Sequence, residues 1–303
     1  MKRIIRIGTR GSKLALWQAE YTCDALRAVG AESELVIIKT KGDQIQDLSF
    51  DKMEGKGFFT KEIEDALLRG DIDLAVHSMK DLPTRQPDGL CISAVSYRED
   101  PSDVLLVREK MVTPGKLLQL PDGAIIGTSS SRRKAQILDF RPDLQIRDLR
   151  GNVPTRLDKL RQGDYDAILL AQAGLNRLNA SLSGLTVIPL NPREFVPAPA
   201  QGVLAWQTNA ADLPIRRLLQ RLHHPEVSAA TNVERKVLQL LGGGCHLPLG
   251  VFCERDAMGH YHAWAAHAPS WNGPVTRVRL SSSTSYQLAE KIAENLKGKE
   301  VAG

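Results

Sequence analysis

The pattern of apolar and polar residues near the N-terminus predicts a strand, a turn and a helix. IIRI at residues 4–7 is a short apolar run, and the turn GTRGS that follows ends in Ser12, a residue type that caps helices. Apolar residues then recur every three or four positions, which is the spacing of one helical face, until Gly30 ends the helix. The residues that share this face are Leu14, Trp17, Tyr21, Ala25 and Ala28.

The next elements alternate between strand and helix around one long polar stretch. LVIIK at 35–39 is predicted as a strand, residues 60–70 as a capped helix, and IDLAVHS at 72–78 as a buried strand. Residues 40–59 show no clear period. A loop of about 20 residues inside a compact domain is unusual, and such a loop is often a lid or a binding loop.

The order of elements then repeats. AIIGTSSSRRKAQIL at 124–138 has the features of the N-terminus in the same order: a strand, Gly-Thr, a turn with serines, basic residues and a helix. TRLDKLRQGDYDAILLA at 155–171 resembles TKEIEDALLRGDIDLAV at 60–76, including the Gly-Asp-x-Asp before the strand. Strand–turn–helix units are common, but this order agrees twice, which favours two α/β lobes built on one plan.

Two segments connect these lobes. YREDPS at 97–102 lies between predicted strands at 92–95 and 103–107, and the proline-rich NPREFVPAPAQG at 191–202 is the return connection. A double connection of this kind is typical of a hinged clamp. The predicted fold class is therefore α/β, with two similar periplasmic-binding-protein-like lobes and a hinged cleft.

The pattern changes from about residue 222. A helix containing VERKVLQLL leads into a glycine-rich turn, and three strands and a last helix follow, which predicts a small α+β domain with Cys245 on its first loop. The predicted domains are a first lobe over 1–98 and 201–219, a second lobe over 102–197, and a C-terminal domain over 222–303.

Composition narrows the class of protein. The 303 residues are 42% hydrophobic and 25% charged, and no apolar stretch approaches the ~20 residues needed to span a bilayer. The basic N-terminus has no continuous apolar core of a secretion signal, since Arg6 interrupts it. Four cysteines without C-x-x-C pairing argue against disulfide or zinc scaffolds. We expect a cytoplasmic protein without a membrane partner. A net charge of +5 suggests an anionic ligand.

Polar residues gather where the predicted strands end. Ligands of open α/β sheets bind outside the carboxyl ends of the strands. Hydroxyls and amides at a helix N-terminus, with guanidinium groups beside them, form a carboxylate or phosphate site. One such group would indicate only a solvated surface, but several at equivalent strand ends favour a cleft for a polyanion. The residues are Arg10, Ser12, Ser78, Lys80, Asp81, Thr128, Ser129, Ser130, Arg132, Arg133, Arg150, Arg156 and Arg177.

Asp81 is the one carboxylate among these cations. It could cap a helix or pair with Lys80, and for an isolated aspartate those interpretations would be preferred. In a cationic cleft it could instead stabilise a positive intermediate and transfer protons.

Cys245, in LGGGCHLPLG at 241–250, has three interpretations. It could be a buried structural cysteine. It could ligate a metal with Cys253, His246, His260 or His262, although that spacing fits no standard zinc template and no metal is expected. It could also be a nucleophile or an attachment point on a glycine loop that projects into the cleft.

Several motifs together carry a family resemblance along essentially the whole chain. They are IGTRGSKLALWQ, GKGFFTKEIE, DLAVHSMKDLP, GTSSSRR, LRGNVPTRL, AGLNRL, PAPAQG and GGGCHLPLG. With these blocks in this order, the chain closely resembles the hydroxymethylbilane synthase family, also called the porphobilinogen deaminase family. Its members are transferases of haem and tetrapyrrole biosynthesis.

The resemblance implies a covalent cofactor and a reaction. Cys245 stands where the family holds a dipyrromethane primer through a thioether. Four porphobilinogen units are joined head to tail on this primer, ammonia is lost at each addition, and water releases 1-hydroxymethylbilane. Asp81 matches the catalytic aspartate, which would help expel the amino group and take up the ring proton.

The resemblance also assigns binding residues and partners. Cofactor and substrate carboxylates would be bound by Arg10, Ser12, Gln18, Ser78, Lys80, Thr128, Ser129, Ser130, Arg132, Arg133, Arg150, Arg156, Gly174, Arg177 and Gln201. Lys56 and Phe59 lie on the expected lid. The family suggests a monomer whose product passes to uroporphyrinogen-III synthase.

The chain departs from the family pattern in four places. Ala200 stands where glycine is usual before Gln-Gly, and WQTN at 206–209 replaces a run that commonly contains an acid and an arginine. Ser131 and His246 replace a usual leucine and a frequent glutamine. None of these changes removes Asp81 or Cys245, but the first two affect the hinge region and Gln201.

Two other functions remain open from the residues alone. A non-enzymatic, two-lobed anion-binding protein would share the cleft but would need neither Asp81 nor Cys245. A nucleic-acid binder is suggested only by the isoelectric point of about 9.0, and 5% aromatic residues without a recognition motif argue against it.

Overall fold

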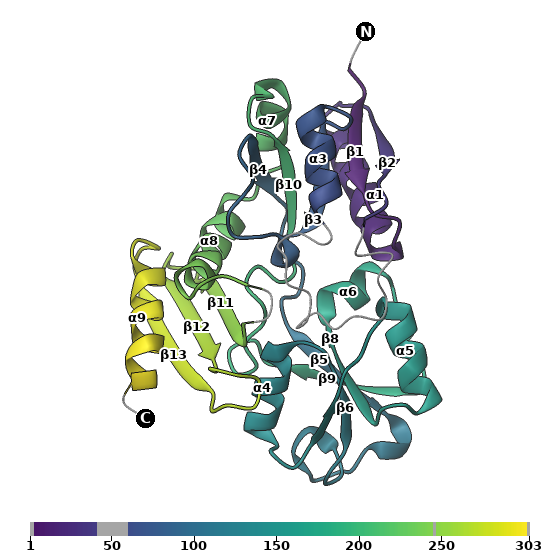
Figure 1. The fold of residues 1–303 in the computed structure, drawn as a ribbon, viewed down its shortest axis with the longest axis vertical. Helices are drawn as coiled ribbons and strands as arrows, with labels where there is room; N and C mark the ends of the chain where they lie inside the picture. The colour runs from purple at the N-terminus through teal and green to yellow at the C-terminus, as the bar shows by residue number, and fades with distance from the viewer. Residues whose placement is uncertain (1–2, 41–59, 245–246, 302–303) are drawn as a thin grey trace. The chain divides into compact units, whose positions relative to one another are not determined.

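The computed structural model describes residues 3–40, 60–244 and 247–301, and the chain divides into two compact units (Figure 1). The first contains the described residues up to Glu99 together with Gly202–Ala229. The second contains Asp100–Gln201 together with the described residues from Ala230 onward.

The first unit is built on a five-stranded sheet of order β2-β1-β3-β10-β4, in which β1 is parallel to β2 and β3 while β10 is antiparallel to β3 and β4. Helices α1 and α7 share an apolar cluster with this sheet, and α3 belongs to a separate cluster. The elements are β1 (Ile5–Thr9), α1 (Lys13–Ala28), β2 (Ser33–Ile37), α3 (Lys61–Arg69), β3 (Leu74–Ser78), the 3₁₀ turn η2 (Met79–Asp81), β4 (Leu90–Val95), β10 (Leu204–Asn209) and α7 (Leu213–Gln220).

The second unit repeats this plan. Its sheet has the order β7-β6-β8-β5-β9, with β6 parallel to β7 and β8 while β5 is antiparallel to β8 and β9. The matching strand order confirms the predicted duplication of the lobes. The elements are β5 (Asp103–Arg108), η3 (Glu109–Met111), η4 (Leu117–Gln119), β6 (Ile125–Gly127), α4 (Ser131–Phe140), β7 (Gln145–Arg147), α5 (Val153–Gln162), β8 (Ala167–Ala171), α6 (Gln172–Arg177) and β9 (Leu185–Leu190).

Helices cover both faces of this second sheet. Along β5, Leu105 packs in one apolar cluster with Ile137 of α4, while the next residue, Leu106, packs in another with Leu157 of α5. Successive strand residues point to opposite faces, so α4 and α5 lie on opposite sides of the sheet.

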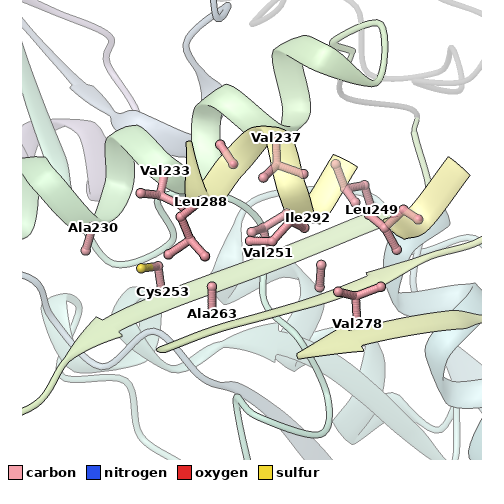
Figure 2. Packing of buried hydrophobic residues seen from close by; sticks show 13 residues of the cluster. Ala230, Val233, Val237, Leu249, Val251, Cys253, Ala263, Val278, Leu288 and Ile292 are labelled. Atoms are coloured by element: carbon pink, nitrogen blue, oxygen red, sulfur yellow. The ribbon is translucent and has the colours of Figure 1, made fainter. Parts of the chain in front are cut away.

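A second, smaller sheet completes the second unit. It is antiparallel, of order β11-β12-β13, and its core is shared with two helices, as Figure 2 shows for Val237, Val251 and Ile292. This is the predicted C-terminal α+β arrangement. The elements are α8 (Pro225–Leu240), β11 (Leu249–Arg255), β12 (Tyr261–His267), β13 (Thr276–Ser282) and α9 (Leu288–Val301). The residues of α8 up to Ala229 belong to the first unit.

Buried contacts connect this small sheet to the return segment before it. Phe252 and Trp264 stack at 5.8 Å between ring centroids and pack with Val196. A Cβ on Gly250 would lie 2.3 Å from the backbone oxygen of Val196, so only glycine allows β11 to approach this closely.

Two predictions about local structure were wrong in detail. The second strand begins two residues earlier than expected, at Ser33. Ser12 does cap α1, since its side chain accepts a hydrogen bond from the Ala15 amide, but the fully buried residues of this helix are not the predicted apolar stripe. They are Gln18, Ala19, Thr22 and Leu26.

The polar residues of α1 are buried because the sheet supplies partners for them. Gln18 donates to Ser78 Oγ at 2.8 Å, and Thr22 Oγ1 accepts from the indole nitrogen of Trp206 at 2.9 Å. Trp17 and Tyr21, which were expected to be the core of the helix face, stack on each other at 5.6 Å and are only partly buried.

Candidate functional site

The carboxyl edge of the first sheet carries one group of candidate residues. Because β1 and β3 are adjacent and parallel, the segments that follow Thr9 and Ser78 leave the sheet at the same edge. The hydrogen bond from Gln18 to Ser78 joins α1 to the end of β3. This unit therefore brings together the predicted Arg10, Ser12, Gln18, Ser78, Lys80 and Asp81.

Asp81 is the last residue of the 3₁₀ turn that follows β3. Its side chain is exposed, and its carboxylate makes no hydrogen bond or ion pair with any residue that the structure describes. The two structural interpretations, a helix cap and an ion pair with Lys80, therefore find no support. A carboxylate at a strand end that none of the described residues binds is suited to a ligand.

A buried polar network that the sequence did not predict lies behind this edge. The ring of His77 donates from Nε2 to Gln207 Oε1 at 3.1 Å, and Gln207 Nε2 donates to Glu64 Oε1 at 3.1 Å and to Gln86 Oε1 at 2.8 Å. Burial lowers the pKa of His77 to about 4, although the bond to Gln207 acts in the opposite direction. His77 is therefore neutral near pH 7. The WQTN departure was the only sequence signal of this network.

The carboxyl edge of the second sheet carries the other group. Ser130 caps α4 and accepts from the Arg133 amide at 3.4 Å. Thr128 Oγ1 accepts from the Ser130 amide at 3.3 Å, while Ser129 Oγ donates to Leu149 O at 3.1 Å and accepts from the Leu149 amide at 3.0 Å. Ser129 thereby fixes the chain before α5. The hydroxyls and amides at the start of α4 therefore lie at this edge of the sheet.

The two adjacent arginines of α4 are both more than nine-tenths buried. Arg132 Nη1 donates to Asp103 Oδ2 at 2.7 Å, and Arg133 Nη2 donates to Asp103 Oδ1 at 2.7 Å. Burial alone would raise the pKa of Asp103, but the charges of Arg132 and Arg133 outweigh it and hold that pKa far below its usual value. Asp103 was predicted only as the start of a strand.

The remaining candidates of this unit lie before or on α5 and on α6. Arg156 Nε donates to Gly151 O at 2.7 Å beside Asn152, the cap of α5. Gly174 and the buried Arg177 lie on α6, directly after β8, and Arg150 is half-buried before α5.

Gln201 lies at the end of the return segment and is almost fully buried. Its Nε2 donates to Pro101 O at 2.8 Å, to Ser102 O at 3.3 Å and to Asp103 Oδ1 at 2.9 Å. The Gln201 side chain therefore joins the return segment to the first connection. The backbone of Ala200 has φ of +62°, a left-handed conformation that accounts for the usual glycine there.

Three predicted residues lie outside the described residues. They are Cys245, the expected attachment point, and Lys56 and Phe59 of the expected lid. The donor set of the second unit suits the carboxylates of a pyrrole cofactor, since two buried guanidinium groups share a single carboxylate. Among the residues that the structure describes, no group of three or more acidic, histidine or cysteine side chains is placed to hold a metal ion. No helix in these ranges combines the length and apolar character needed to cross a bilayer.

The solved structures compared with this chain are only distantly similar to it. A probable amino-acid ABC transporter extracellular-binding protein from Bacillus subtilis has a TM-score of 0.45 at 12% identity, covering 73% of this chain and 92% of that chain. The periplasmic VFT2 domain of BvgS from Bordetella pertussis has a TM-score of 0.44 at 14% identity, covering 72% and 86%.

Sequence relatives are much closer. Residues 5–217 match the family described as "Porphobilinogen deaminase, dipyromethane cofactor binding domain". Curated proteins named porphobilinogen deaminase include one from Syntrophobacter fumaroxidans, 47% identical over 82% of this chain and 79% of its own. Those from Chloroherpeton thalassium and Streptococcus sanguinis are 44% and 40% identical, covering 96% and 99% of this chain and 92% and 98% of their own. The chain belongs to the porphobilinogen deaminase family.

Proposed function

We propose that this protein is a hydroxymethylbilane synthase, a transferase that joins four porphobilinogen molecules head to tail with loss of ammonia and then releases 1-hydroxymethylbilane. Family membership supports the reaction type. The observation that carries the proposal in the structure is Asp81, an exposed carboxylate without a described partner at the end of β3. A protein that only bound anions would gain nothing from a negative charge at this position.

The dipyrromethane cofactor supplies the pyrrole end to which each new unit is joined. We assign its thioether attachment to Cys245. The start of α4 would hold its acetate and propionate groups, because Ser130 and the first amides of that helix favour anions and Arg132 and Arg133 add positive charge.

Asp81 would perform the acid–base chemistry. Its carboxyl group can donate a proton to the departing amine and, once ionised, stabilise the positive charge that develops on the substrate methylene. The same Oδ atoms can then accept the proton that leaves the ring after coupling. A single aspartate suffices because each step returns it to its starting protonation state.

The other residues would bind carboxylates of the substrate and of the growing chain, which gains negative charge at each addition. In the first unit these are Arg10, Ser12, Gln18, Ser78 and Lys80, and in the second they are Thr128, Arg150, Arg156, Gly174 and Arg177. Ser129 and Gln201 would act by holding neighbouring segments in place, because their polar hydrogens are already donated within the protein. Lys56 and Phe59 would belong to a lid. We further propose a cytoplasmic monomer of three domains that passes its product to uroporphyrinogen-III synthase.

Turnover of porphobilinogen tests this proposal. Cofactor-loaded protein should consume porphobilinogen and release one ammonia for each molecule consumed. Asp81→Asn should lower the rate by about 10²–10⁴-fold, the usual contribution of a general acid–base group. Asp88→Asn, which changes an exposed aspartate of the same unit, should leave the rate unchanged. Loaded wild-type protein without turnover would refute the function, and a near-normal rate in Asp81→Asn would refute the acid–base role.

A further inference from the structure

Asp103, the first residue of β5, is the centre of a buried polar cluster in the second unit. Its side chain is fully buried and accepts hydrogen bonds from three side chains. Arg132 Nη1 binds Oδ2 at 2.7 Å. Oδ1 accepts from Arg133 at 3.2 Å (Nε) and 2.7 Å (Nη2), and from Gln201 Nε2 at 2.9 Å. Both carboxylate oxygens are therefore engaged.

This cluster lies at the edge of the sheet where a ligand would bind. Because β5 runs antiparallel to β8, its first residue, Asp103, pairs with Ala171 at the carboxyl end of β8. Arg133 Nη1 also donates to Leu169 O on the same strand, at 3.1 Å. Arg133 is thus held in place by both the Asp103 side chain and the backbone of β8.

The charges of the cluster do not cancel. Two guanidinium groups, each more than nine-tenths buried, face one carboxylate, which leaves one positive charge in excess. A buried charge is costly unless it has a partner. One carboxylate of a ligand would complete the balance, and Arg132 can still offer N–H groups, since its hydrogen bonds to described residues all come from Nη1.

The same carboxylate is linked to both segments that connect the lobes. Gln201, at the end of the return segment, donates to Asp103 and also to Pro101 O in the first connection. Arg132 Nη1 donates to Val196 O, at the beginning of the proline-rich part, at 2.9 Å. Movement of either segment would therefore displace the arginine side chains, either through Asp103 or through the direct bond from Arg132 to Val196 O.

Resting on the proposed function, we propose that Asp103 is a positioning residue for the reaction: it orients the Arg132 and Arg133 guanidinium groups so that they bind a carboxylate of the pyrrole chain. Long arginine side chains lose considerable rotamer freedom when they are fixed. A carboxylate that fixes them before the ligand arrives removes that cost from binding. Asp103 does not itself contact the reacting atoms.

The test measures primer loading as well as turnover. Wild type, Asp103→Asn and Asp103→Glu are produced in cells unable to make porphobilinogen, and the apoproteins are titrated with porphobilinogen. Intact mass follows the gain of two pyrrole units, and KM and kcat are measured for the loaded fraction. Asp166→Asn is the matched control, because Asp166 is a partly buried carboxylate of the same lobe that accepts from Arg108 at 2.9 Å. All variants are compared at a temperature at which near-ultraviolet circular dichroism shows them folded.

We expect Asp103→Asn to raise two concentrations at least tenfold: the porphobilinogen concentration that half-saturates primer loading, and the KM for turnover. Asp166→Asn should lower the melting temperature but leave both concentrations as in wild type. Asp103→Glu keeps the negative charge that pairs with Arg132 and Arg133, so this variant should fold. Because its carboxylate is displaced by one methylene, it should still raise both concentrations at least threefold. Wild-type concentrations in Asp103→Asn or Asp103→Glu would overturn the positioning role. Wild-type apoprotein that gained no pyrrole mass would overturn the proposed function and this inference with it.

Discussion

Glu234 of α8 connects the return segment to the C-terminal sheet, and its replacement gives a sharp test of how the second unit is held together. The side chain is fully buried. One oxygen accepts from the Ala200 amide at 2.6 Å and the other from the Cys253 amide at 2.7 Å. Ala200 belongs to the return segment, and Cys253 lies on β11. Both amides depend on this one carboxylate.

The cost of Glu234→Gln follows from these two bonds. A hydrogen bond to a charged group contributes about 1.5–3 kcal/mol, and a neutral one about 0.5–1.5 kcal/mol. The amide that replaces the carboxylate can accept only one of the two bonds, and that bond becomes neutral. We therefore expect Glu234→Gln to lower the free energy of unfolding of the second unit by about 3 kcal/mol.

Two measurements check this value. Urea denaturation followed by fluorescence gives the change in unfolding free energy, and hydrogen exchange reports the amides of Ala200 and Cys253 directly. Glu294→Gln is the control, because Glu294 is exposed on α9 and should change stability by no more than about 0.5 kcal/mol. A loss below 1 kcal/mol in Glu234→Gln, with both amides as protected as in wild type, would refute the reasoning.

Three further predictions concern other parts of the fold. His77 is neutral in the folded protein, with its pKa lowered by burial to about 4, while the unfolded chain binds a proton below pH 6.5. Stability should therefore fall by roughly 3 kcal/mol in total as the pH decreases from about 6.5 to 4, and His77→Gln should flatten this dependence in pH-dependent denaturation. Ala200→Val should destabilise by about 2 kcal/mol or more in thermal unfolding, since a branched side chain resists φ of +62°, whereas Ala200→Gly should be tolerated. Ile292→Ala removes a fully buried side chain of the C-terminal core and should cost about 2–5 kcal/mol by denaturant titration (Figure 2).

The order of the elements and their duplication could be predicted because both are recorded locally in the sequence. Periodicity and Gly-Asp-x-Asp gave equivalent strands and helices in the two lobes, and the matching strand orders confirm the common plan. The buried face of α1 could not be predicted in this way. Gln18 and Thr22 are buried because their partners, Ser78 and Trp206, come from positions 60 and 184 residues further along the chain.

In the candidate site, too, some residues could be predicted from local sequence and others depend on distant partners. Motifs at strand ends were sufficient to single out Asp81 and the arginine pair as candidates. Asp103 carries no motif, because a carboxylate at the start of a strand looks like an ordinary surface residue until the fold brings Arg132 and Gln201 to it. At Ala200 the sequence showed that alanine replaces the usual glycine, but it did not show that the backbone is left-handed there.

The most direct test of the account is the intact mass of the denatured protein, purified from cells that make porphobilinogen. We predict an added mass equal to two linked pyrroles, and peptide mapping should place it on Cys245. Protein that stays unmodified, even after incubation with porphobilinogen, would contradict the covalent primer and favour an anion-binding protein without this chemistry.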